Sequence, residues 1–182
     1  MQRACYHQGM RTHILQRAGM AAPLLPLLAC ALLAGCNPTY HWRDYASRDH
    51  SYKVLFPARP ASFTRAVDLN GVRVQMTMTA AEVDGATFAV GSAVLPDAAR
   101  AQAALPAMRR ALLRNIGAPD TGAAAADGSI DASGNGANGQ PVRLIGRFEA
   151  RGARIYQVVV MGKADAAPPE HVEQFLTSFT SH

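Results

Sequence analysis

The stretch that decides the fold is Val142–Met161, which reads VRLIGRFEARGARIYQVVVM in one-letter code. Apolar and polar residues alternate on both sides of Arg151-Gly152, and this pattern predicts a β-hairpin of Val142–Ala150 and Ala153–Met161. A two-residue turn there pairs Phe148 with Ile155 and Leu144 with Val159 on one face, and Glu149 with Arg154, Arg147 with Tyr156 and Ile145 with Val158 on the other; a three-residue turn with a bulge would shift these pairs. Both faces carry apolar residues, so we expect a central strand pair that is covered on both sides.

Four further strands are predicted before this hairpin, over residues 52–56, 63–69, 72–79 and 87–94. Asn70-Gly71 lies between two of them and is a strong signal for a type I′ turn, because both central positions of that turn need a positive φ. Asp84-Gly85 marks the next turn. Sequential turns at short spacing predict an antiparallel meander.

Two helices are predicted from capping signals and apolar spacing. Asp97 is a candidate N-cap, and the apolar stripe that follows it is Leu105, Met108, Leu112 and Ile116. Pro106 is expected to begin the main helix after a short segment over 98–104. Pro168-Pro169-Glu170 begins the last helix, whose stripe is Val172, Phe175, Leu176 and Phe179. The element order predicts an α+β domain, with an antiparallel sheet of about six strands and helices packed on its faces.

Residues 117–141 are rich in glycine and alanine, and Ile130 is their one large aliphatic residue. A structureless connection of this length is uncommon in a compact domain. We expect a mostly mobile surface loop. The alternative is that Ile130 lies on a weak edge strand.

The N-terminal segment has the order of a secretory signal, with basic residues before an uncharged run over 18–35 that ends in small residues. The run closes with Leu33-Ala34-Gly35-Cys36, which resembles a bacterial lipobox. That resemblance implies recognition of Leu33, Ala34 and Gly35 by a signal peptidase, cleavage after Gly35, and a diacylglyceryl group on the sulfur of Cys36. An uncleaved transmembrane helix is the alternative, against which Pro23 and Pro26 argue. The start codon is Met1 or Met10.

This interpretation divides the chain into a signal peptide over 1–35, a lipidated polar tether over 36–50 and a single domain over 51–182. Three aromatic residues of the tether, Tyr40, Trp42 and Tyr45, would lie at lipid headgroups or would cover the domain's own edge. Bacterial lipoproteins with Asp after the lipidated cysteine tend to stay at the inner membrane. Asn37 therefore favours the outer membrane, with the domain facing the periplasm, over the inner membrane.

The formal net charge of +5 overstates how basic the folded part is. All 13 Asp and Glu residues follow residue 35, together with 15 of the 18 basic residues, which leaves +2 for the mature chain. Nucleic acid is therefore not an expected partner. Cys5 and Cys30 leave with the leader, so the domain has no thiol for a disulfide or a metal.

Several short segments of the mature chain resemble small exported bacterial proteins that are similar in turn to the PsbP-like fold. These segments are Tyr52–Pro57, Gly71-Val72, Val94–Pro96, Arg147-Phe148, Gly152–Val158 and Phe175–Phe179. The resemblance implies an antiparallel sheet sandwiched between helices. It implies no activity, because the matched positions are core and turn positions.

A search for chemistry finds no nucleophile elbow, no P-loop and no set of metal ligands, so we expect no cofactor and no metal. The mature chain has 13 Arg and two Lys. A candidate surface for anions or a protein partner consists of Arg143, Arg147, Arg154 and Tyr156. We expect a membrane-anchored, non-enzymatic accessory or binding module of the bacterial envelope. The alternative is a periplasmic enzyme with a dispersed active site.

Overall fold

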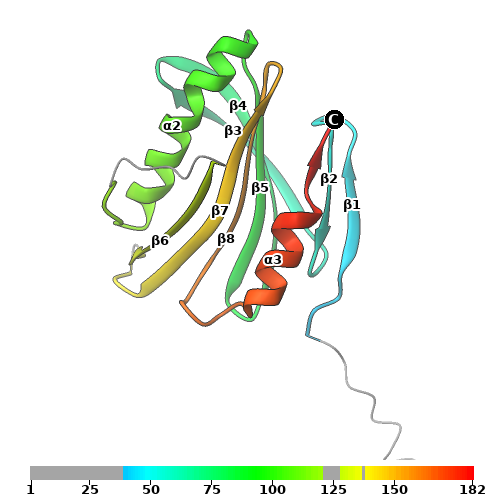
Figure 1. Ribbon diagram of the computed structural model, residues 1–182, viewed down its shortest axis with the longest axis vertical. Helices are drawn as coiled ribbons and strands as arrows, with labels where there is room; N and C mark the ends of the chain where they lie inside the picture. The colour runs from blue at the N-terminus through cyan, green and yellow to red at the C-terminus, as the bar shows by residue number, and fades with distance from the viewer. Residues whose placement is uncertain (1–38, 121–127, 137) are drawn as a thin grey trace, which may run out of the picture. The chain divides into compact units, whose positions relative to one another are not determined.

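A computed structural model describes residues 39–120, 128–136 and 138–182. It is an α+β domain built around a six-stranded antiparallel sheet in the order β3-β4-β5-β8-β7-β6 (Figure 1). The strands of this sheet are β3 (Ala61–Leu69), β4 (Val72–Val83), β5 (Ala86–Val94), β6 (Ser129–Asn135), β7 (Pro141–Arg151) and β8 (Arg154–Gly162). The second sheet contains β1 (Arg43–Ser47), β2 (Tyr52–Phe56) and β9 (Thr180–Ser181). The helices are α2 (Ala98–Asn115) and α3 (Pro169–Ser178).

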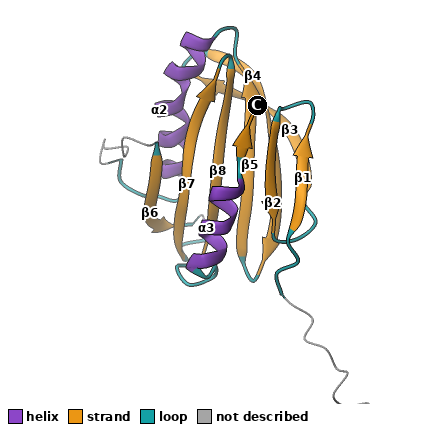
Figure 2. Cartoon of the chain, turned by 45° about the vertical axis from the view of Figure 1, so that its right-hand side comes forward, coloured by secondary structure: helices purple, strands orange, loops and turns teal. Residues whose placement is uncertain are grey.

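The large sheet is covered on both faces, as the hairpin pattern predicts (Figure 2). On β8, Ile155 and Val159 join the core beneath α2, whereas Tyr156, Val158 and Val160 join the core beneath α3 and the small sheet. Burying a large apolar side chain contributes about 1.5–3 kcal/mol. Two such cores therefore hold the three layers together.

The two short turns predicted from sequence are confirmed. Asn70 and Gly71 have φ angles of 55° and 81°, and Asp84 and Gly85 have 51° and 78°. Consecutive positive φ angles are what a type I′ turn requires. These turns set the register of β3, β4 and β5.

The predicted register of the β7–β8 hairpin is wrong, because the turn lies one residue later in the chain than expected. Arg151 pairs with Arg154, so the turn residues are Gly152 and Ala153, and Phe148 faces Gln157 instead of Ile155. Gly152 has a φ of 57° and occupies the first central position, where a type II′ turn places glycine. The face that each side chain occupies is as predicted, because moving the turn by one residue shifts the pairing by two.

The expectation of a tether over 36–50 is wrong for its described part. Residues 43–47 form β1, which pairs with β2 from Arg43 opposite Phe56 to Ser47 opposite Tyr52. The aromatic rings cover the domain's own edge, with Tyr45 at 5.5 Å from Phe56 between ring centroids. Consequently β2 belongs to the small sheet, and it is not one of the six strands of the large sheet.

The sixth strand of the large sheet is β6, at its edge, within the segment expected to be a mostly mobile loop; the alternative, that Ile130 lies on an edge strand, is confirmed. It pairs with β7 along its whole length, and Ile130 is buried at 7% exposure. Gly134 makes this packing possible, because a Cβ there would lie 1.9 Å from the carbonyl oxygen of Ile116 at the end of α2. Residues 121–127 and 137 of the expected loop lie outside the described residues.

Helix α2 begins as predicted, since the Asp97 side chain accepts a 2.7 Å hydrogen bond from the backbone N–H of Arg100. It does not begin again at Pro106, which lies within one continuous helix. The buried residues Ala101 and Ala104 precede Pro106 and the buried Met108 follows it, so the buried face of the helix is continuous, while Pro106 itself is exposed to solvent. Packing of this stripe offsets the cost of an interior proline.

Candidate functional site

The four residues of the predicted anion or partner surface do not form one exposed surface. Arg143 makes two hydrogen bonds to the carboxylate of Asp131, at 2.9 and 2.7 Å. The Arg147 Nη2 donates to the backbone carbonyl of Phe179 at 3.0 Å, and its guanidinium lies 5.6 Å from that ring's centroid. Tyr156 is fully buried.

Three of these side chains join the two sheets. Arg154 Nη1 donates to the backbone carbonyl of Asp49 at 3.0 Å, and the Tyr156 hydroxyl donates to that of His50 at 2.7 Å. Arg147 holds the segment that leads into β9. These three side chains therefore make structural contacts between the layers and do not form the predicted binding surface, because β1, β2 and α3 cover the face from which they project. Cys36 and the lipobox residues Leu33, Ala34 and Gly35 lie outside the described residues.

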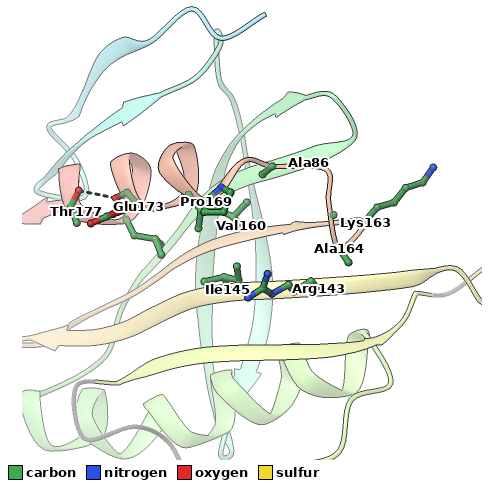
Figure 3. Close-up of a pocket in the computed structure, with 13 residues that line it drawn as sticks. Ala86, Arg143, Ile145, Val160, Lys163, Ala164, Pro169, Glu173 and Thr177 are labelled. Atoms are coloured by element: carbon green, nitrogen blue, oxygen red, sulfur yellow. Dashed lines mark hydrogen bonds between the residues drawn. The ribbon is translucent and has the colours of Figure 1, made fainter.

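A groove lies between α3 and strands β7 and β8 (Figure 3). Its volume of about 360 Å³ is in the range of small-molecule sites. We call it the α3 groove. Its walls are largely apolar and are formed by Ala86, Ile145, Val160, Gly162, Ala164, Ala167, Pro169, Val172 and Leu176.

Four polar residues also line the α3 groove: Arg143, Lys163, Glu173 and Thr177. Arg143 lies on β7, and the hydrogen bonds that it donates to Asp131 lower the pKa of that carboxyl and raise the pKa of the arginine. The Thr177 hydroxyl donates to the backbone carbonyl of Glu173 at 2.7 Å and is thus occupied within the helix. Lys163 lies at the end of the groove away from Thr177, and its ammonium group has no hydrogen bond or ion pair with any described residue (Figure 3).

Sequence reasoning missed the α3 groove. The signal for it is the run Gly162–Ala167, in which small residues follow a strand and precede the two prolines that begin α3. Small side chains at Gly162, Ala164 and Ala167 leave space between the strand and the helix. That space becomes visible only when α3 is placed over the large sheet.

A second hollow, of about 630 Å³, lies beside His50 over Arg73, Gln75 and Thr77. It is flanked by β3, whose residues 61–66 are exposed. It is therefore open to solvent along β3, which makes it a weaker candidate than the α3 groove.

Among the described residues, no group of three or more His, Cys, Asp or Glu side chains is placed to hold a metal ion. No helix in this part of the chain combines the length and apolarity needed to cross a bilayer. No protein-family model, curated protein or solved structure matches the chain.

Proposed function

We propose that this protein is a lipid-anchored lipoprotein of the bacterial envelope that acts as a non-enzymatic binding module. The anchor is a diacylglyceryl group on Cys36, at the end of the apolar leader. More than one acyl chain makes such an anchor stable. Asn37 after the lipidated cysteine favours the outer membrane, with the domain on the periplasmic side, over the inner membrane.

The α3 groove is the observation that supports a binding role. Its apolar walls and its volume of about 360 Å³ suit a small apolar or amphiphilic ligand, or an apolar segment of an envelope protein. An enzyme would instead be supported by convergent polar groups with shifted pKa values inside a cleft. Arg143 is the lining residue with a resolved pKa shift, and Asp131 accounts for it.

The anchor is tested by growing cells with labelled palmitate. The wild-type protein should incorporate the label, and Cys36→Ser should abolish incorporation. Unchanged labelling of the Cys36→Ser variant would contradict the proposed anchor.

The binding role is tested by affinity capture of the lipidated protein from crosslinked envelopes. Ala167→Trp fills the α3 groove, and Ala99→Trp places the same side chain at an exposed position at the start of α2. We expect the wild-type protein and Ala99→Trp to capture a species that Ala167→Trp does not capture. Identical profiles for all three proteins would count against the groove as the binding site.

A further inference from the structure

The chain between Cys36 and the domain is short. His41 already belongs to the fold, since its backbone N–H donates to the carbonyl of Pro57 at 2.7 Å. Tyr40 is also fixed, with its ring centroid 3.9 Å from that of His171. Four residue steps from Cys36 to Tyr40 span at most about 14 Å when fully extended. An anchor at Cys36 would therefore hold this end of the domain close to the bilayer.

The end of the domain that carries Tyr40 also carries one mouth of the α3 groove. In Figure 1, β1 begins at the same end as the β4–β5 turn and the connection from β8 to α3. Contacts agree with this view, because the Tyr40 ring lies against that of His171 in the first turn of α3, and burial together with the charges of Asp84 and Glu170 raises the pKa of the Tyr40 hydroxyl. Ala86, Gly162, Lys163 and Ala164 line the groove at this end.

The groove is apolar behind this mouth, and its charged residues lie at its ends and along β7. Ile145, Val160, Val172 and Leu176 form the interior walls. Lys163 is exposed at the mouth, where its side chain extends outward from the groove (Figure 3), and its ammonium group has no partner among the described residues. A chain of methylene groups suits the interior, and an anionic group suits Lys163.

The neighbours of Lys163 restrict the headgroup further. Asp165 and Glu170 are exposed on the same connection and in the first turn of α3, and Asp84 lies in the nearby β4–β5 turn. These carboxylates would repel a headgroup that carries only a negative charge. A zwitterionic headgroup places its phosphate at Lys163 and its ammonium group among the carboxylates.

From these observations we infer that the α3 groove holds one acyl chain of a zwitterionic membrane phospholipid, taken directly from the bilayer against which the anchor holds the domain. This inference rests on the proposed anchor at Cys36. It adds the chemical class of the ligand and the direction from which the ligand enters. With a lipid chain in the groove, α3 would stay next to the membrane surface.

The test uses the lipidated full chain in vesicles of phosphatidylethanolamine that contain a phosphatidylethanolamine probe with a diazirine at the end of one acyl chain. After illumination, peptide mapping should find the probe on the interior walls of the groove. Ala167→Trp should reduce this labelling several-fold, and Ala99→Trp should not. Lys163 is exposed, so Lys163→Glu leaves the core intact, and this variant should also reduce groove labelling several-fold.

A flexible glycine-serine insert of about 20 residues between Asn37 and Pro38 separates the anchor from the domain by about 25 Å on average. We expect it to reduce groove labelling while palmitate incorporation at Cys36 stays unchanged. The inference is overturned if labelling is confined to the surface around Tyr40 and Trp42, or if Ala167→Trp and Lys163→Glu both label like the wild type. Groove labelling unchanged by the insert would overturn entry from the bilayer. Absence of palmitate incorporation at Cys36 in the wild-type protein would instead refute the proposed anchor. Failure of the anchor and failure of the lipid-binding groove are therefore distinguishable.

Discussion

The hydroxyl of Tyr156 on β8 donates a hydrogen bond of 2.7 Å to the backbone carbonyl of His50, in the turn between β1 and β2. The two residues are 106 positions apart in the sequence. The bond joins the centre of the large sheet to the small sheet that covers it. Tyr156 is thus both a core residue and a polar contact between layers.

Tyr156→Phe removes this bond and leaves the ring in place. Because the carbonyl of His50 then lacks its donor, we expect the free energy of unfolding to fall by about 1–2 kcal/mol. Tyr40→Phe is a matched control, since the Tyr40 hydroxyl is buried and has no hydrogen-bond partner among the described residues. Its removal should change stability by less than about 0.5 kcal/mol or should increase it. Urea unfolding of both variants provides the comparison, and equal losses would contradict the assigned contact.

Arg147 and Arg143 should differ in their importance for stability. Arg147→Met keeps an apolar stem but loses the bond to the carbonyl of Phe179 and the contact with its ring, and we expect a loss of about 1–2 kcal/mol. Arg143 and Asp131 are 41% and 56% exposed, and Arg143→Met should cost less than about 1 kcal/mol. Thermal unfolding distinguishes the two. A larger loss for Arg143→Met would reverse the assignment.

Stability should fall in alkaline solution because of Tyr52. Burial raises the pKa of Tyr52 to about 12, against an opposing hydrogen bond with Thr79. Since the folded pKa exceeds the unfolded value near 10, the contribution of about 3 kcal/mol is complete below about pH 10 and is lost as pH rises through 12. Tyr52→Phe should flatten this part of the stability curve, measured by urea unfolding at a series of pH values. The pKa values of Tyr40 and Tyr156 are also raised by burial, so some slope should remain.

Gly134→Ala tests whether β6 is an ordered strand against the end of α2. The added Cβ would lie 1.9 Å from the carbonyl oxygen of Ile116, so the strand or the helix end must shift. We expect a loss of about 1–3 kcal/mol. Ser133→Ala, at the adjacent exposed position, should stay within about 0.5 kcal/mol of the wild type. A neutral Gly134→Ala would support the mobile loop expected from sequence.

Local signals predicted much of the fold. Asn70-Gly71, Asp84-Gly85, Asp97 and Pro168-Pro169 each act through their own backbone conformation or a neighbouring N–H, and they mark elements that the structure confirms. The alternation over Val142–Met161 likewise predicted which faces are buried. Such signals depend on residues a few positions apart.

The parts that sequence reasoning missed depend on contacts between distant residues. Residues 43–47 are too polar for their sequence to indicate a strand, and they form β1 because they pair with β2. β6 has a single large aliphatic residue and is ordered by β7 and α2. The spacing of Arg147 and Arg154 could not show that their side chains contact Phe179 and Asp49, in the segments that cover this face of the large sheet. The α3 groove likewise appears only once the helix is docked.

The central claim is that the mature protein begins at lipidated Cys36. Mass spectrometry of the N-terminal peptide from protein extracted from membranes tests it most directly. The account predicts a peptide that begins at Cys36 and carries a diacylglyceryl thioether together with an acyl chain on its amino group. An unmodified peptide that begins at Met1 or Met10, or one that reads through Gly35 into an unmodified Cys36, would contradict it.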